Sequence, residues 1–312
     1  MTEHFVTLFD KNYALFGLAL HHSLASHGGD FCLWVVCMDS DTEELLTSMQ
    51  LSNLRVVPLR NVENEQLLSV KRGRTEGEYC WTLAPFSVSA VFNLDSAVRR
   101  VTYLDSDVYF FNDPRILLRE LVHAGKDVLI TEHAYDPVYD QSASCGRFCV
   151  QFVTFNNSLE GLRVLKWWQD RCLEWCFNRI EDGKFGDQKY LDSWPELFTN
   201  EVHILQSRDE TLAPWNVKSL LRPNQLPVMY HFHGLRFISR TRVRLYDGYH
   251  VGKLAARLYD EYIEVMKEIA RRNSNYQFKL AKESRPLGVR ECWRRIRSRI
   301  NSSRSEVSIS GL

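Results

Sequence analysis

Two aspartates two positions apart are the residues in this chain best suited to hold a metal ion. Asp105 and Asp107 flank Ser106 and directly follow the largely apolar run 100–104, which has the character of a strand. Side chains at positions i and i+2 of an extended backbone leave on the same face, so both carboxylates can converge on one hard divalent cation. A cation held in this way can bridge a diphosphate. Acidic pairs are also common in the loops that end strands, so the triplet needs support from the rest of the chain.

Three downstream segments carry further side chains of this kind. They are Gly186-Asp187-Gln188, which opens a short helix, Trp215-Asn216, which follows a strand, and His231-Phe232-His233-Gly234, which ends another. A neutral histidine can donate a lone pair to a metal, and a carboxylate can orient an acceptor hydroxyl. Each segment also has a structural alternative: a helix N-cap for Asp187, a turn packed on the core for Trp215, and a buried strand residue for His231.

Taken in order, these motifs resemble those of a known enzyme family. The succession Asp-x-Asp, Asp-Gln, Trp-Asn-Val and His-Phe-x-Gly is similar to that of the metal-dependent retaining glycosyltransferases, which include glycogenin and the bacterial lipopolysaccharide galactosyl- and glucosyltransferases. The resemblance covers about residues 5–234 and identifies the chain as a divergent member. It implies that Asp105, Asp107 and His231 bind Mn²⁺ or Mg²⁺.

The residues at the reaction centre follow the family only in part. The resemblance implies that Asp187 and Gln188 are catalytic and lie beside the reacting sugar and the acceptor. Family members have a lysine six residues after the metal-binding histidine, where it neutralises the leaving diphosphate, but this chain has Phe237. Arg236 or Arg240 could supply that charge instead.

The residues expected to contact the donor sugar depart further from the family. Where the family has an asparagine and a glycine in the strand 148–156, this chain has Cys149 and Gln151. The family's arginine upstream of the metal motif is absent, and Trp81 stands nearest to its position. The identity of the sugar is therefore open, and retention of configuration rests on the resemblance alone.

A nucleotide-binding loop is expected directly after the first strand. A base and ribose could rest on Tyr13 and hydrogen-bond near Asp10 and Asn12, although either polar side chain could equally cap the helix that follows. The expected donor-binding residues are Phe9, Asp10, Asn12, Tyr13, Trp81, Asp105, Ser106, Asp107, Gln151, Trp215, Asn216, Gly234, Arg236 and Arg240.

Alternating strands and helices must position these side chains. Strand-like runs lie at residues 5–9, 31–38, 54–59, 101–104, 128–131, 148–155, 202–205 and 228–232, with helical patterns between the early ones. Such units require right-handed crossovers and a mostly parallel sheet, which binds ligands beyond the carboxyl ends of its strands. The predicted class is α/β. The resemblance implies the GT-A nucleotide-diphospho-sugar transferase fold, with helices flanking the sheet and a C-terminal helical extension.

Three regions are expected along the chain. Residues 1–245 form the GT-A catalytic domain. Residues 246–283 form a helical extension, packed on the body through a helix from Asp247 to Arg272. The apolar stripe of that helix is expected to consist of Leu254, Leu258, Tyr262, Val265 and Ile269.

Residues 284–312 are expected to form a basic amphipathic helix and a flexible tail. From position 285 onward, seven arginines stand against two glutamates, a net charge of +5 that leaves −5 on the rest of a chain with zero net charge. Apolar residues at helical spacing run through the arginines, at Val289, Trp293, Ile296 and Ile300. This pattern is typical of a helix lying on an anionic membrane surface, and a helix end that packs Trp293 on the body is the alternative.

Composition limits the class of protein. With 312 residues, 45% hydrophobic content and zero net charge, the chain is an ordinary globular protein for which no nucleic-acid partner is expected. No apolar run approaches the ~20 residues needed to cross a bilayer, and no signal peptide is expected. The eight cysteines lie mostly in apolar segments, which favours reduced thiols and a cytoplasmic protein. If the basic C-terminal helix binds lipid, this protein would be peripheral on the inner face of the plasma membrane. A zinc site from the pairs Cys145/Cys149 and Cys172/Cys176 is the less favoured interpretation.

The sequence therefore predicts a Mn²⁺-dependent hexosyltransferase that uses a nucleotide sugar, with UDP as the expected nucleotide, and a glycan or lipid-linked surface-polysaccharide acceptor. Two other classes stay open. A sugar-1-phosphate nucleotidyltransferase would also bind a nucleotide and a metal, but the loop 9–12 lacks the glycine-rich phosphate motif of such enzymes. A non-catalytic, membrane-associated nucleotide-binding protein would explain the basic tail, but not the joint presence of the other motifs.

Overall fold

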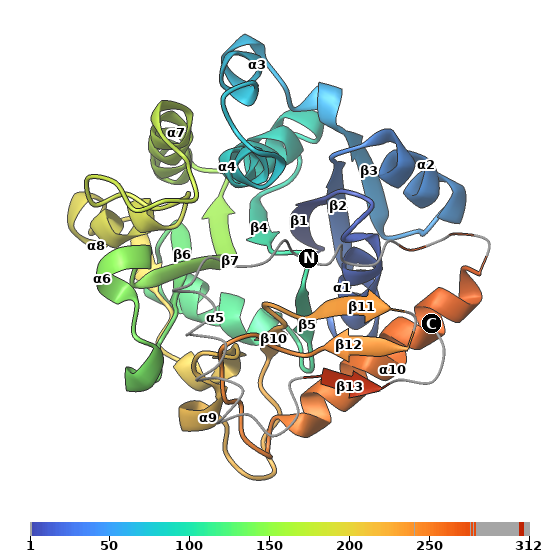
Figure 1. The fold of residues 1–312 in the computed structure, drawn as a ribbon. Helices are drawn as coiled ribbons and strands as arrows, with labels where there is room; N and C mark the ends of the chain where they lie inside the picture. Colours follow the sequence, from blue (N-terminus) through green and yellow to red (C-terminus); the bar gives the residue numbers. More distant parts are fainter. Residues whose placement is uncertain (1, 240, 275, 277, 279–305, 309–312) are drawn as a thin grey trace.

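A seven-stranded sheet with helices on both faces organises the molecule (Figure 1). The computed structural model describes residues 2–239, 241–274, 276, 278 and 306–308. The strand order is β3-β2-β1-β4-β7-β6-β8. The strands are β1 (Glu3–Phe9), β2 (Phe31–Cys37), β3 (Leu54–Pro58), β4 (Arg100–Leu104), β6 (Val128–Glu132), β7 (Phe148–Asn156) and β8 (Val202–Ile204). Neighbours from β3 to β4 pair in parallel, whereas β7 runs antiparallel to both β4 and β6.

Two layers of helices cover the sheet. Helices α4 (Glu76–Leu94) and α7 (Leu159–Glu174) lie on one face, and α1 (Ala14–His27) and α5 (Arg115–Ala124) lie on the other. The remaining helices are α2 (Ser40–Met49), α3 (Glu65–Lys71), α6 (Ser142–Cys145), α8 (Trp194–Leu197), α9 (Val217–Leu220) and α10 (Ala256–Arg272), with 3₁₀ turns η1 (Leu59–Asn61), η2 (Pro137–Tyr139), η3 (Lys189–Ser193) and η4 (Arg208–Glu210). Among the described residues, no helix has both the length and the apolarity needed to span a bilayer.

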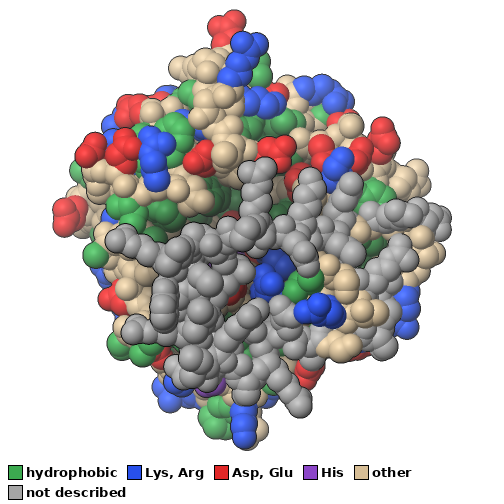
Figure 2. Space-filling view, in the orientation of Figure 1, with side chains coloured by type: hydrophobic (Ala, Val, Ile, Leu, Met, Phe, Trp, Pro, Cys, Tyr) green, Lys and Arg blue, Asp and Glu red, His purple; other side chains and the backbone are tan. Residues whose placement is uncertain are grey.

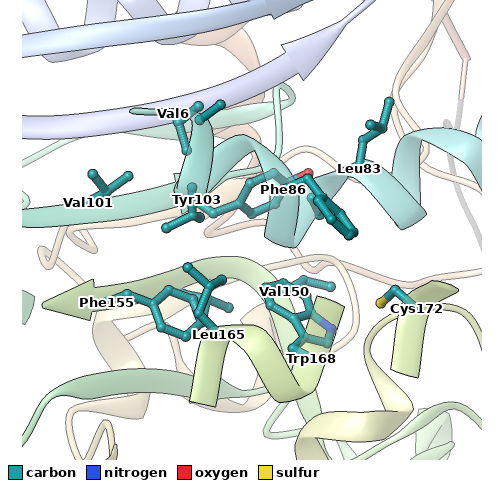
Figure 3. Packing of buried hydrophobic residues seen from close by; sticks show 14 of the residues in the cluster. Val6, Leu83, Phe86, Val101, Tyr103, Val150, Phe155, Leu165, Trp168 and Cys172 are labelled. Carbon is teal, nitrogen blue, oxygen red and sulfur yellow. The ribbon is translucent and has the colours of Figure 1, made fainter. Parts of the chain in front are cut away.

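Successive side chains of a strand point to opposite faces of the sheet, so one strand contributes residues to the hydrophobic core on each face. On β1, Phe5 packs in the cluster with α1 and α5, and the next residue, Val6, packs in the cluster with α4 and α7, as expected where successive side chains leave opposite faces. Figure 3 shows the second cluster, in which Phe155 of β7 stacks on Trp168 of α7 with ring centroids 6.1 Å apart. Thr75 begins α4 with a capping box completed by Glu78. The strands that lead to the site are thus held in place by hydrophobic packing on both faces of the sheet.

Two small sheets extend the body. One has the order β5-β10-β9 and consists of β5 (Val108–Phe110), β10 (Met229–His231) and β9 (Thr211–Leu212). The other consists of β11 (Arg236–Ser239), β12 (Arg242–Arg244) and β13 (Glu306–Ser308). The predicted strand 228–232 therefore belongs to a separate sheet and pairs antiparallel with β5, directly after the acidic turn.

The C-terminal region differs from the prediction in two places. The helix expected from Asp247 begins nine residues later, at Ala256, because Gly248 and Gly252 adopt φ +81° and +76°, which a right-handed helix excludes. Leu254 of the expected stripe is 46% exposed. Residues 306–308, expected in a flexible tail, form β13 on the edge of β12. The predicted basic helix within 284–300 lies outside the described residues.

The contact between α10 and the body yields a stability prediction. Tyr262 is fully buried and stacks on Phe232 with centroids 3.8 Å apart, while its hydroxyl has no hydrogen-bond partner among the described residues. Tyr262→Phe keeps the ring and removes an unpaired polar group, so the free energy of unfolding should stay within about 1 kcal/mol of the parent or rise. Tyr262→Ala should lower it by about 3–5 kcal/mol. Urea unfolding measures both, and a large loss in the Phe variant would contradict this packing.

Candidate active site

A cavity of about 720 Å³ opens beyond the carboxyl ends of β1 and β4. Its walls come from the loop after β1, the first turns of α4, and the segments that follow β4, β6 and β10. Parallel α/β sheets bind ligands at this edge. The predicted site residues that line the cavity are Phe9, Asp10, Asn12, Tyr13, Trp81, Asp105, Ser106, Asp107, Asp187, Gln188, Trp215, His231 and Arg236.

The acidic turn between β4 and β5 faces the end of β10. His231 pairs with Val108 across the β5–β10 ladder, and the Phe232 amide donates to the Asp107 carbonyl at 2.8 Å. This register carries the His231 ring onto the carboxylates. Its Nε2 lies 3.0 Å from Asp107 Oδ1 and 3.8 Å from Asp105 Oδ2. Strand pairing therefore brings the three predicted metal ligands together.

Burial and mutual charge set the protonation of these groups. Burial raises the pKa of Asp105 to about 6, although the nearby His231 opposes the rise. Burial also disfavours an ionised Asp107, but the charge and hydrogen bond of His231 more than offset it and hold the pKa of Asp107 below its usual range. Conversely, burial would lower the pKa of His231, yet the two carboxylates together raise it. A proton on His231 and a divalent cation would therefore compete for the same carboxylates.

The donor set fits a divalent metal. Two ligands about 2.1 Å from an octahedral ion and at right angles to each other lie about 3 Å apart, close to the observed separation of Asp107 Oδ1 and His231 Nε2. Two carboxylates and one imidazole are donors that Mn²⁺ and Mg²⁺ accept. Within the described part of the chain, however, no group of three or more His, Cys, Asp or Glu side chains is arranged so that it could already hold a metal ion. A metal ion held by these residues would therefore have to displace the direct contact between Asp107 and His231.

The predicted catalytic pair lies across the cavity at the start of η3. Asp187 is 4% exposed, and burial, reinforced by the charge of Asp105, raises its pKa well above the ordinary value. Gln188 donates its amide to the Cys145 carbonyl at 2.7 Å, which ties η3 to α6. η3 has no side-chain N-cap, so the structural alternative for Asp187 finds no support there.

The loop after β1 forms one wall. The Asn12 amide donates to Asp10 Oδ1 at 2.9 Å, so Asp10 closes a turn. Helix α1 begins at Ala14 without a side-chain cap, so neither Asp10 nor Asn12 has the capping role that was the alternative. Both therefore remain as cavity-lining polar groups.

Arg236 stands where the missing lysine would be needed. Its guanidinium donates to the Tyr13 hydroxyl at 2.6 Å and lies 5.1 Å from the centre of that ring. Phe237, which occupies the family's lysine position, is buried and contacts Phe16 with centroids 6.1 Å apart. Of the two predicted arginines, Arg236 thus reaches the cavity, and Arg240 lies outside the described residues.

Three predicted donor-binding residues do not line the cavity. Gln151 is fully buried and bonds to the His231 ring. Asn216 is also fully buried, where its side chain accepts from the Ala213 amide. Gly234 adopts φ +82°, a left-handed turn after β10 that favours glycine. In this structure they support the wall rather than form its surface.

Sequence reasoning missed most of an aromatic wall of the cavity. Four further rings line the cavity next to Trp215, namely those of His133, Tyr135, His233 and Tyr249. His133 stacks on Tyr135 at 4.6 Å with the planes 9° apart, and Trp215 meets His133 edge-on at 5.2 Å. The signal was present in the sequence, because the first two rings directly follow the predicted strand 128–131, where a parallel sheet places ligand-binding side chains.

No protein-family model matches the chain. The chain is 32% identical over 260 residues to the uncharacterized protein YfnF of Bacillus subtilis (strain 168), which covers 78% of this chain and 85% of YfnF. It is 30% identical over 259 residues to the uncharacterized protein YfnD of the same organism, covering 78% of this chain and 81% of YfnD.

Solved structures share the architecture at low sequence identity. Mouse xyloside xylosyltransferase 1 in its apo form matches with a TM-score of 0.51 and 13% identity, over 75% of this chain and 98% of that one. The apo form of the glycosyltransferase GlyE of Streptococcus pneumoniae TIGR4 matches with a TM-score of 0.51 and 14% identity, over 91% and 66% of the two chains. The predicted GT-A fold is thereby confirmed.

The buried carboxyl of Asp187 yields a prediction for stability against pH. Because its pKa is higher in the folded state, the folded protein binds more protons than the unfolded one above the ordinary aspartate pKa, and stability is lost as pH rises. Asp187→Asn removes this loss. The variant should be more stable than the parent at pH 7.5, by ~1.4 kcal/mol for each pKa unit of the shift, and the gap should close towards pH 4. Urea unfolding at the two pH values measures the gap, and a variant that is less stable at pH 7.5 would refute the assignment.

Proposed function

Because the chain belongs to the same family as YfnF and YfnD of Bacillus subtilis and has the GT-A fold, we propose that it is a glycosyltransferase that moves a hexose from a nucleoside diphosphate, with UDP as the expected nucleotide, to a glycan acceptor. One observation carries the proposal. Asp105, Asp107 and His231 meet in a cavity that also holds a buried carboxyl, Asp187, and a cation, Arg236.

The reaction demands charge neutralisation at one end of this cavity. The bond between the anomeric carbon and the diphosphate oxygen breaks, a bond from the same carbon to the acceptor oxygen forms, and negative charge collects on the diphosphate. Arg236 is the cavity-lining guanidinium suited to that charge, and its contact with Tyr13 holds it at the side where the nucleotide is expected. A divalent ion on Asp105, Asp107 and His231, Mn²⁺ or Mg²⁺, would supply Lewis-acid stabilisation of the same diphosphate when bound.

Asp187 and Gln188 would serve the sugar and the acceptor. Burial raises the pKa of Asp187 above its ordinary value and so favours the neutral acid, a form that can donate a hydrogen bond to a sugar hydroxyl. Neither residue is well suited as a nucleophile in that state. We therefore propose a front-face displacement with retention, in which the acceptor proton passes to the departing diphosphate oxygen.

The aromatic wall favours a sugar ring as the acceptor. Flat faces of Tyr135 and Trp215 can contact the apolar face of a pyranose, and aromatic linings with few polar groups are typical of small-molecule sites. Burial lowers the pKa of His133 to about 3, so this ring is neutral and offers no charge to a phosphate. The acceptor group that enters the cavity is thus proposed to be a glycan, whether free or lipid-linked.

Neither rival class gains support. Asp10 and Asn12 line the cavity, and the loop that holds them lacks the glycines that a nucleotidyltransferase uses to cradle phosphates. Acidic and basic side chains are mixed along the visible rim of the molecule rather than gathered in one basic field, as Figure 2 shows, and no nucleic-acid partner is proposed. Contact of residues 284–312 with an anionic membrane remains a prediction.

Loss of a metal ligand gives the sharpest test of this proposal. Asp107→Ala should abolish Mn²⁺-dependent binding of UDP because one chelating carboxylate is removed, and titration calorimetry with UDP in Mn²⁺ or EDTA measures it. Asp170→Ala is the matched control, since Asp170 lies on the exposed side of α7 and pairs only with Lys166 among the described residues. An unchanged Mn²⁺-dependent affinity for UDP in the Asp107 variant would contradict the assignment of Asp107 as a metal ligand.

The aromatic wall gives a separate prediction for the acceptor. Tyr135→Ala should raise the KM for the acceptor about tenfold, equivalent to ~1.4 kcal/mol of lost contact, while hydrolysis of the donor in the absence of acceptor stays near the parent rate. Tyr135→Phe keeps the ring and should keep the KM. Initial rates at varied acceptor concentration measure both, and an unchanged KM in the Ala variant would place the acceptor elsewhere.

A further inference from the structure

Gln151 lies at the junction between the two parts of the predicted metal site. It belongs to β7, which runs antiparallel beside β4 so that Phe152 pairs with Leu104. This register places Gln151 next to the acidic turn, where its backbone carbonyl accepts from the Asp105 amide at 3.4 Å. Its side chain contacts the ring of His231. One residue therefore contacts two of the three predicted ligands.

The side-chain contact fixes which nitrogen of His231 faces the carboxylates. Gln151 Oε1 lies 2.9 Å from His231 Nδ1, and an amide oxygen only accepts, so Nδ1 carries the proton. The other nitrogen, Nε2, then points at Asp107 Oδ1, 3.0 Å away. In the neutral ring this leaves the Nε2 lone pair on the side of the predicted metal ligands. Metal-binding histidines generally depend on such a partner for the second nitrogen.

Gln151 is poorly placed to stabilise the fold for its own sake. Its side chain is fully buried and does not line the cavity, and its amide nitrogen has no hydrogen-bond partner among the described residues. A buried, unpaired donor disfavours folding. A side chain that weakens the core while holding His231 is best explained by its action on the ring.

We propose that Gln151 is a positioning residue that orients His231 and selects its Nδ1-protonated form, so that Nε2 is available to a divalent cation held with Asp105 and Asp107. This inference rests on the proposed function, because it concerns the same cation. It replaces the predicted role of Gln151 as a direct contact to the donor.

The test compares two glutamines that are both buried. Gln151→Met keeps the volume and removes the acceptor. Gln169→Met makes the same change on α7, where Gln169 bonds to Ser89 and Pro85, two residues that do not line the cavity. Gln151→Glu is the conservative variant that restores an acceptor oxygen. Mn²⁺ affinity of each purified full-length protein is measured by electron paramagnetic resonance, and the thermal midpoint is measured in EDTA.

The expected result is a 10- to 100-fold weaker Mn²⁺ affinity in Gln151→Met, with an unchanged or higher thermal midpoint in EDTA. Gln169→Met should keep the parental Mn²⁺ affinity, and Gln151→Glu should recover at least part of it. If the parent and the Gln151→Met variant bind Mn²⁺ equally well, the inference is overturned and the proposed function is unaffected. A parent that binds no Mn²⁺ would overturn both. Equal losses of affinity in the two Met variants would show a general effect of core substitution and would also overturn the inference.

Discussion

The antiparallel pairing of β5 with β10 is the contact on which the site depends. Residues 105–107 and 231 are far apart in the chain, and the register that sets His231 opposite Val108 carries the imidazole onto two carboxylates. The Phe232 amide locks this register by donating to the Asp107 carbonyl. A slip of one residue would turn His231 to the opposite face of the strand and separate the three groups. The small sheet β5-β10-β9 thus sets the geometry of the proposed site.

The site contains two buried carboxyl groups, Asp105 and Asp187, whose ionisation the folded state disfavours. Burial raises the pKa values of Asp105 and Asp187, whereas the mutual attraction of His231 and Asp107 more than offsets the burial of these two groups. Such groups are disfavoured in a protein interior unless another interaction uses them, and shifted pKa values cluster at functional sites. The core clusters on both faces of the central sheet provide the rigid support that holds these groups in place.

Much of the central sheet could be predicted from the sequence, because strands and their ends are marked by local patterns of apolar and polar residues. The apolar runs predicted the strands of the central sheet, and motif order predicted which polar residues share one cavity. The contact of Gln151 with His231 was missed because it depends on which strands pair and in which register, and neither is encoded locally. The ring of Tyr135 was missed although it follows the end of a predicted strand. The late start of α10 was missed because the apolar spacing was followed across Gly248 and Gly252, which adopt left-handed conformations before the helix.

Turnover of a nucleotide sugar tests the central claim most directly. The purified full-length protein would be incubated with UDP-, GDP-, CDP- and dTDP-linked sugars in Mn²⁺, Mg²⁺ or EDTA, and release of the nucleoside diphosphate would be measured. The account predicts release from one donor that depends on the divalent ion and is lost in EDTA. No release from any donor, combined with no nucleotide binding by calorimetry, would contradict the account and would favour a non-catalytic protein with a glycosyltransferase fold.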